Sequence, residues 1–219
     1  KGAILGFGLW FVMILVMAIM VNTIHNEKEL QNLVNIPCIG QIPHVRRSER
    51  KGGSVLYYQL QRSNYGESLR MLRLRAEKAL RKQGKNVLLV SSAVPGEGKT
   101  TISTNLALSW ANKGKKVLLI DCDMRRPTLA EKMGLNKKPG LSEYLTGQYE
   151  FVDVVQCYGK EKEEVIFHVV TAGENPPNPV ELLSSSRMEK LLEVLRKEFD
   201  YIIIDLPPVN IVSDALSVA

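Results

Sequence analysis

The chain has 219 residues, of which 45% are hydrophobic and 24% are charged. This composition is typical of folded globular proteins and excludes wholesale disorder. Lysine and arginine number 29 against 23 aspartates and glutamates, so the net charge is 29 − 23 = +6. The three cysteines, Cys38, Cys122 and Cys157, are odd in number and widely spaced, which excludes a disulfide framework and a CxxC-type zinc site.

An apolar segment begins almost at the start of the chain. Residues 3–21, AILGFGLWFVMILVMAIMV, carry no charged or strongly polar side chain over 19 positions. As a helix they would be about 28 Å long, close to the hydrocarbon thickness of a bilayer. We therefore expect a transmembrane helix within residues 1–24, with a signal sequence or a buried core helix as the alternatives. Because the chain begins with Lys1, we also expect that a natural N-terminal part precedes it.

The positive charge is concentrated after this segment. Residues 25–85 carry 13 basic and 5 acidic side chains, a net charge of 13 − 5 = +8, whereas residues 86–219 carry 15 and 18, a net charge of −3. The basic side of a membrane helix is usually cytoplasmic, and a basic stretch beside a membrane attracts anionic lipid headgroups. We therefore expect residues 25–64 to be a juxtamembrane linker that meets membrane lipid. A nucleic-acid partner is not expected.

Residues 65–219 alternate between two patterns. Short apolar runs rich in valine, isoleucine and leucine are typical of strands buried on both faces of a parallel sheet, and helical periodicity separates them. This alternation predicts an α/β fold, a doubly wound and mostly parallel sheet flanked by helices. The expected strands cover residues 86–90, 117–120, 165–171 and 201–204, and the expected helices cover residues 65–83, 100–113, 142–146 and 179–197.

A phosphate-binding loop follows the first expected strand. Residues 93–100, AVPGEGKT, match the P-loop pattern except that Ala93 replaces its first glycine. Glycines allow backbone N–H groups to approach phosphate oxygens, the lysine supplies positive charge, and the threonine hydroxyl can bind Mg²⁺. The sequence thus predicts a P-loop NTPase-like domain that binds ATP. The expected nucleotide contacts are Pro95, Gly96, Glu97, Gly98, Lys99, Thr100 and Thr101, with Arg125 from the following motif.

Aspartates end two further strands. Asp121 and Asp123 lie in LLIDCDMRRP, and Asp205 lies in YIIIDLPPV. Open α/β sheets bind their ligands at the carboxyl ends of the strands, and buried carboxylates there need a cation or a proton to offset their charge. We expect Thr100, Asp121 and Asp205 to hold Mg²⁺ and either Asp121 or Asp123 to accept a proton. Helix capping by the aspartate pair is the alternative.

A third pattern lies on the expected helix over residues 65–83. Glu67, Arg70 and Arg73 recur at spacings of three and therefore lie along one side of the helix. Sequence alone favours a solvated charged face, because such faces are common and intrahelical ion pairs contribute only a few tenths of a kcal/mol.

Together these motifs resemble those of the bacterial tyrosine kinases of capsular and exopolysaccharide synthesis. In that family the loop and the two aspartate motifs are called Walker A, A′ and B, and the kinase is fused to, or paired with, a transmembrane chain-length regulator. Three further segments share the resemblance: the E-x2-R-x2-R pattern of residues 67–73, IPCIGQIP at residues 36–43, and NPPNPVELLSSSRM at residues 175–188.

The resemblance implies an Mg-ATP-dependent protein-tyrosine autokinase at the bacterial inner membrane, with a cytoplasmic kinase domain. It assigns Lys99 to the phosphates, Thr100, Asp121 and Asp205 to Mg²⁺, and Asp121 or Asp123 to deprotonation of the acceptor. It also implies a ring of subunits joined through the face of Glu67, Arg70 and Arg73. Tyrosines of the neighbouring subunit would be the substrate, and the polysaccharide polymerisation and export machinery and a phosphatase would be partners.

The family's tyrosine-rich C-terminal tail has no counterpart before Ala219, so we expect the kinase domain to be truncated there. Two other functions stay open. One is a membrane-tethered partitioning or septum-positioning ATPase that phosphorylates no protein, although such proteins usually carry a lysine where Val94 or Pro95 stands. The other is a chain-length regulator with an inactive nucleotide domain.

Overall fold

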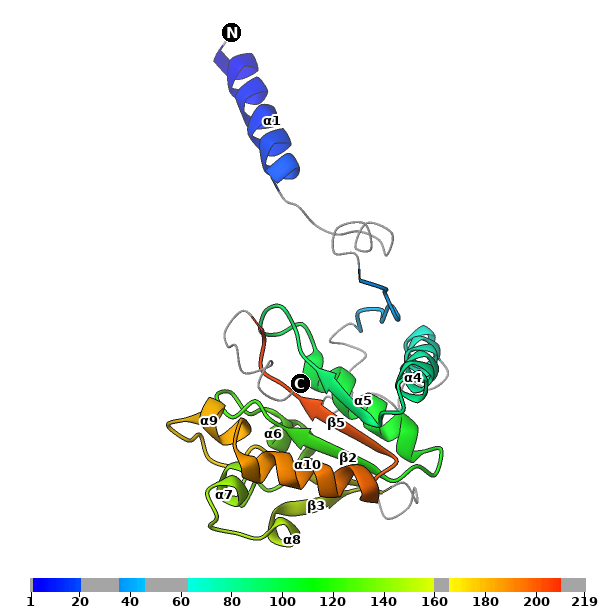
Figure 1. The fold of residues 1–219 in the computed structure, drawn as a ribbon. Coiled ribbons are helices and arrows are strands. Elements are labelled where there is room, and N and C mark those ends of the chain that lie inside the picture. The colour runs from blue at the N-terminus through cyan, green and yellow to red at the C-terminus, as the bar shows by residue number, and fades with distance from the viewer. Residues whose placement is uncertain (1, 21–35, 46–62, 160–165, 210–219) are drawn as a thin grey trace. The chain divides into compact units, whose positions relative to one another are not determined.

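The structure is a computed structural model that describes residues 2–20, 36–45, 63–159 and 166–209 (Figure 1). The chain divides into two compact units, Lys1–Gln41 and Ile42–Ala219. Much of the predicted 25–64 linker, namely residues 25–35 and 46–62, lies outside the described residues.

The first unit contains the helix α1, Gly2–Met20, in the predicted apolar segment. Its described large apolar side chains, among them Phe7, Trp10 and Met17, are exposed. A search of the described residues finds no helix that combines the length and apolarity of a membrane span. The predicted helix is therefore confirmed as a helix, and its place in a membrane stays a prediction.

The second unit is built on a five-stranded sheet. The strands follow the order β1-β5-β2-β4-β3, and all neighbours are parallel except β3, which runs antiparallel to β4. This confirms the predicted mostly parallel α/β sheet and adds β3, an edge strand that the sequence did not predict. The strands are β1 (Val87–Val90), β2 (Val117–Asp121), β3 (Val155–Tyr158), β4 (Phe167–Val170) and β5 (Tyr201–Asp205).

Helices connect the strands. The helix expected over residues 179–197 is two helices, because Ser185 caps a new one by accepting a hydrogen bond from the Met188 N–H. The described helices of this unit are α4 (Asn64–Lys82), α5 (Lys99–Ala111), α6 (Leu129–Met133), α7 (Leu141–Leu145), α8 (Phe151–Val154), α9 (Pro179–Leu183) and α10 (Ser186–Glu198).

Helices cover both faces of the sheet. Alternate residues of a strand point to opposite faces, so Leu119 and Ile203 join one apolar cluster while Ile120 and Ile204 join the other. The first cluster includes α4 and α5, and the second includes α9 and α10. Figure 1 shows α5 and α10 on opposite sides of β5 and β2. Both faces are thus buried at the central strands β2 and β5, which explains why these strands are apolar up to their final aspartates.

The parallel register sets the position of the site. Asp121 at the end of β2 pairs in register with Asp205 at the end of β5, and Val90 at the end of β1 pairs with the same aspartate. The loop that leaves β1 therefore begins beside Asp205, with Asp121 one strand further along the sheet. Strand pairing alone brings together three motifs that are up to about a hundred residues apart in the chain.

Candidate active site

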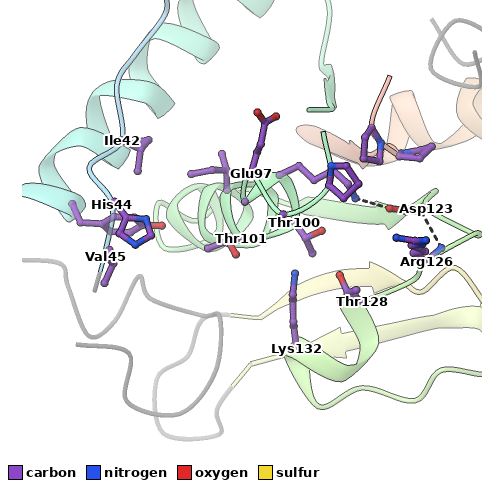
Figure 2. A pocket seen from close by; sticks show the side chains of 18 of the residues that line it. Ile42, His44, Val45, Glu97, Thr100, Thr101, Asp123, Arg126, Thr128 and Lys132 are labelled. Atoms are coloured by element: carbon purple, nitrogen blue, oxygen red, sulfur yellow. Dashed lines mark hydrogen bonds and ion pairs between the residues drawn. The ribbon is translucent and has the colours of Figure 1, made fainter. Parts of the chain in front are cut away.

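A cavity of about 810 Å³ opens at this edge of the sheet. Its volume lies within the range of about 300–1,000 Å³ that small-molecule and cofactor sites occupy. Every residue predicted to contact the nucleotide lines it: residues 95–101 and Arg125. Asp123 and Arg126 line it as well, and Figure 2 shows their side chains beside the phosphate-binding loop.

The phosphate-binding loop has the backbone that its glycines permit. Gly96 and Gly98 have φ angles of 88° and 99°, in the left-handed region that side chains disfavour. Gly98 is the N-cap of α5, which begins at Lys99, so the positive end of this helix faces the cavity. Glu97 accepts hydrogen bonds from the backbone N–H groups of Ala93 and Val94 and so closes the loop on itself.

Lys99 is held by carboxylates. Its Nζ atom lies 2.8 Å from Asp123 Oδ2 and 3.9 Å from Asp205 Oδ1. The Asp123 side chain is fixed in turn, because its Oδ1 accepts a hydrogen bond from the Arg126 N–H. The lysine predicted for the phosphates and one of the two aspartates predicted for proton transfer therefore meet in one ion pair.

Asp121 and Asp205 are buried at 1% exposure each. Asp121 Oδ1 accepts a hydrogen bond from the Asp123 N–H, and Asp205 Oδ1 accepts one from the Ser103 hydroxyl. The Oδ2 atom of each aspartate is buried with no hydrogen-bond partner among the described residues. Two orphaned carboxylate oxygens at the end of neighbouring strands are an uncommon and costly arrangement in a folded protein.

This burial changes the acidity of both groups. Desolvation and the nearby charge of Asp205 raise the pKa of Asp121 to about 8 from its usual 3.8. Desolvation also raises the pKa of Asp205, against the opposing effects of Lys99 and of a hydrogen bond from Thr100. Carboxyl groups with raised pKa values at a cavity edge are typical of functional sites.

The donor set fits a magnesium ion. Oxygen ligands from one or two carboxylates and a hydroxyl, completed by water and phosphate, are what Mg²⁺ prefers. Thr100, Asp121 and Asp205 supply such oxygens. A bound cation would compensate the two buried Oδ2 atoms that have no hydrogen-bond partner among the described residues. Among the described residues, no group of three or more His, Cys, Asp or Glu side chains forms a metal site by itself.

Sequence analysis missed part of the cavity wall. Ile42, Pro43, His44 and Val45 also line the cavity, and Val45 is buried in the core. The sequence predicts these residues as part of the juxtamembrane linker over residues 25–64. Lys132 of α6 also lines the cavity and belongs to no motif.

The three residues predicted to form the ring contact, Glu67, Arg70 and Arg73, differ in their exposure to solvent. Glu67 and Arg70 are exposed and form an ion pair of 2.9 Å. Arg73 is buried at 8% exposure, and its guanidinium lies 2.6 Å from the Glu77 carboxylate. The three side chains therefore do not form one solvated face within a single chain. Whether they join subunits stays a prediction.

Comparisons with known proteins show what the chain is similar to. Residues 85–219 match a family described as an AAA domain. The chain is 33% identical over 223 residues to tyrosine-protein kinase ptk of Acinetobacter johnsonii, covering 98% of this chain and 30% of that protein. It is 37% identical over 169 residues to tyrosine-protein kinase YwqD of Bacillus subtilis (strain 168), covering 77% of this chain and 70% of that protein.

A solved structure supports the same relationship. The kinase domain of Escherichia coli tyrosine kinase ETK superposes with a TM-score of 0.79 at 34% sequence identity, covering 88% of this chain and 76% of that one. The lengths differ among the relatives, since the chain spans less than a third of ptk and more than two thirds of YwqD.

Proposed function

The chain belongs to the family of bacterial tyrosine-protein kinases, and we propose that it transfers the γ-phosphoryl group of ATP to protein tyrosine. The observation that carries this proposal is the convergence of Lys99, Asp123, Asp121 and Asp205 on one cavity edge, beside a phosphate-binding loop. Phosphoryl transfer needs positioning and charge neutralisation more than covalent chemistry, and this arrangement supplies both.

The phosphate-binding loop, the start of α5 and Lys99 would each have a separate role in this reaction. The loop N–H groups and the start of α5 bind the phosphates, and Lys99 exchanges its contact with Asp123 for the terminal phosphate oxygens. The tyrosine oxygen then attacks the γ-phosphorus in line. The bond from that phosphorus to the β,γ-bridging oxygen breaks, ADP leaves, and the tyrosine proton passes to a carboxylate.

Asp123 is our choice for that proton acceptor. It lines the cavity, whereas Asp121 lies behind it, buried at the end of β2. Once Lys99 has turned to the phosphates, Asp123 has lost its counter-charge and can take up a proton. Thr100, Asp121 and Asp205 would hold Mg²⁺, which neutralises charge on the phosphates when it is bound.

We further propose that the kinase is anchored in the inner membrane and regulates capsular or exopolysaccharide polymerisation and export. Residues 1–24 would form the anchor, residues 25–64 a juxtamembrane linker that meets lipid, and residues 65–219 the cytoplasmic kinase domain. The apolar helix α1 supports the anchor. Subunits would join through the face of Glu67 and Arg70, and tyrosines of the neighbouring subunit would be the acceptors.

Radiolabelled ATP tests the proposal directly. The chain is incubated with Mg²⁺ and a tyrosine-containing peptide, and phosphotyrosine and free phosphate are measured for wild type, Lys99→Met and the control Lys113→Met. Lys113 is exposed at the far end of α5 and lines no part of the cavity. We expect phosphotyrosine from wild type and from the control, and none from Lys99→Met. Phosphate release without phosphotyrosine would identify the chain as an ATPase switch instead.

A further inference from the structure

The short helix α6 brings a second ammonium group to the cavity. Lys132, in the last turn of α6, lines the cavity together with Lys99 and Thr100. Figure 2 shows its nitrogen directed toward the beginning of α5, where Thr100 and Thr101 lie. The helix is anchored to α5, because the Thr104 hydroxyl donates to the sulfur of Met133 at 3.9 Å. Lys132 is thus held across the cavity from the phosphate-binding loop.

The charged side chains that act on Lys132 are the lysine and the three aspartates of the proposed active site. Desolvation lowers the pKa of Lys132, Asp205 raises it, Lys99 lowers it, and Asp121 and Asp123 raise it. The geometry agrees, because Lys132 lines the same cavity as Lys99 and Asp123.

A triphosphate needs more positive charge here than Lys99 supplies. Asp123 lines the cavity, Asp121 and Asp205 are buried beside it, and Lys99 is engaged with Asp123 and Asp205. The negative charge of a phosphate that binds beside these groups must be balanced by cations on another wall of the cavity. Lys132 approaches from α6, beside Thr128, and faces Thr100 and Thr101.

We infer that Lys132 is a second phosphate-binding cation that contacts the terminal phosphoryl group of the bound nucleoside triphosphate. This inference rests on the proposed function. The loop N–H groups serve the inner phosphates, whereas Lys132 faces Thr100, which would hold Mg²⁺ beside the outer phosphates. Its contact depends on the third phosphate, and Lys132 therefore distinguishes ATP from ADP.

Nucleotide titrations test this assignment. A fluorescent non-hydrolysable ATP analogue and fluorescent ADP, each with Mg²⁺ at 150 mM salt, are titrated into the 219-residue chain. We expect Lys132→Ala and Lys132→Gln to bind the analogue about tenfold more weakly, the effect of about 1.4 kcal/mol, while ADP affinity stays within about twofold. Lys132→Arg should retain most of the affinity. Lys137→Ala, an exposed lysine outside the cavity, is the control and should bind both nucleotides as wild type does.

Each other outcome overturns the inference. Unchanged binding of the analogue shows that Lys132 makes no phosphate contact, and equal losses for the analogue and ADP show a general effect on the cavity. Circular dichroism and thermal melting of both variants identify a loss that arises from unfolding of α6. If wild type binds neither nucleotide, the proposed function fails together with this inference. If wild type binds both and Lys132→Ala matches it, only this inference fails.

Discussion

The Nζ atom of Lys99 lies 2.8 Å from Oδ2 of Asp123, and about nine-tenths of each side chain is buried. The lysine that we propose for phosphate binding is thus paired with a carboxylate. Binding must break this pair, because one ammonium group cannot keep both contacts at full strength. The ion pair therefore lowers nucleotide affinity and at the same time holds Lys99 in the cavity.

Asp123→Asn separates these two effects. The substitution frees Lys99, so we expect nucleotide affinity to rise by about twofold to tenfold, a range of about 0.4–1.4 kcal/mol. Phosphotyrosine formation should fall about 10²-fold or more, because no carboxylate at position 123 accepts the proton of the tyrosine hydroxyl. Nucleotide titration and peptide phosphorylation measure the two quantities. Asp200→Asn is the control, because Asp200 lies at the other end of β5 and accepts a hydrogen bond from the Lys116 N–H. If Asp123→Asn were as active as Asp200→Asn, Asp123 would not be the proton acceptor.

The pKa of Asp121 predicts a dependence of stability on pH. The group titrates near 3.8 in the unfolded chain and near 8 in the folded protein without metal. Between these values the folded protein keeps a proton that the unfolded chain has lost, so the free energy of unfolding falls as pH rises from about 4 to 8. Asp121→Asn removes the charge and should flatten this slope, and it should stabilise the protein by roughly 1–3 kcal/mol at pH 8.

Urea denaturation in EDTA at pH 5.5, 7 and 8.5 measures this effect. Saturating Mg²⁺ and nucleotide provide the contrast, because cation binding favours the ionised carboxylates and should reverse the slope in wild type but not in Asp121→Asn. A wild-type protein whose stability in EDTA does not decrease with pH would contradict the raised pKa.

Sequence predicted the features that depend on a continuous pattern. The strands β1, β2 and β5 are apolar runs, β4 is interrupted only by His168, and the parallel direction of these four strands follows from the helices between them. The sequence therefore located the loop, Asp121 and Asp205 at one edge before the structure was known. Edge strand β3 was missed because its residues, VQCY, mix polar and apolar side chains and are only partly buried. The pairing of β3 with β4 depends on contacts that local sequence does not encode.

The sequence also did not predict the positions of single side chains that depend on how the helices pack. Lys132 lies in a helix of five residues, too short for a periodic pattern, and only the packing of α6 on α5 directs it into the cavity. Arg73 was placed on a charged face by its spacing. It is buried because Glu77, one helical turn further, provides a partner and α5 covers both residues.

This second ion pair predicts a difference between two arginines of the same motif. Glu77 Oε1 accepts hydrogen bonds from Arg73 at 2.6 Å and from the Trp110 indole at 2.8 Å, which ties α4 to α5. Arg73→Ala leaves the Glu77 carboxylate buried without its cation, so we expect a destabilisation of about 3 kcal/mol. Arg70→Ala breaks an exposed pair with Glu67 and should cost less than about 0.5 kcal/mol.

Urea denaturation and light scattering on the same samples separate the two roles. A ring contact alone would change the mass of the oligomer and leave the unfolding midpoint in place. We expect Arg73→Ala to lower the midpoint, whereas any change caused by Arg70→Ala should appear only in the mass. Equal midpoints for both variants would show that the buried pair contributes nothing to stability.

A buried carboxylate also organises the loop that follows β4. Glu143 of α7 accepts hydrogen bonds from the Gly140 N–H at 2.8 Å, the Ser142 hydroxyl at 3.1 Å and the Glu174 N–H at 2.9 Å. The two backbone N–H groups belong to segments more than thirty residues apart in the chain. Gly173 packs so closely that a Cβ atom there would lie 2.1 Å from Glu143 Oε2. The carboxylate thus joins the start of α7 to the segment that leads into α9.

Glu143→Gln tests this organisation. A glutamine has one carbonyl oxygen, so its NH₂ group must face one of the two backbone N–H donors and leave that donor buried and unsatisfied. We expect a destabilisation of about 1–3 kcal/mol, measured by urea denaturation. Glu131→Gln is the control, because Glu131 lies exposed on α6, and it should unfold as wild type does. If Glu143→Gln also unfolds as wild type does, the hydrogen bonds to the carboxylate do not hold the loop.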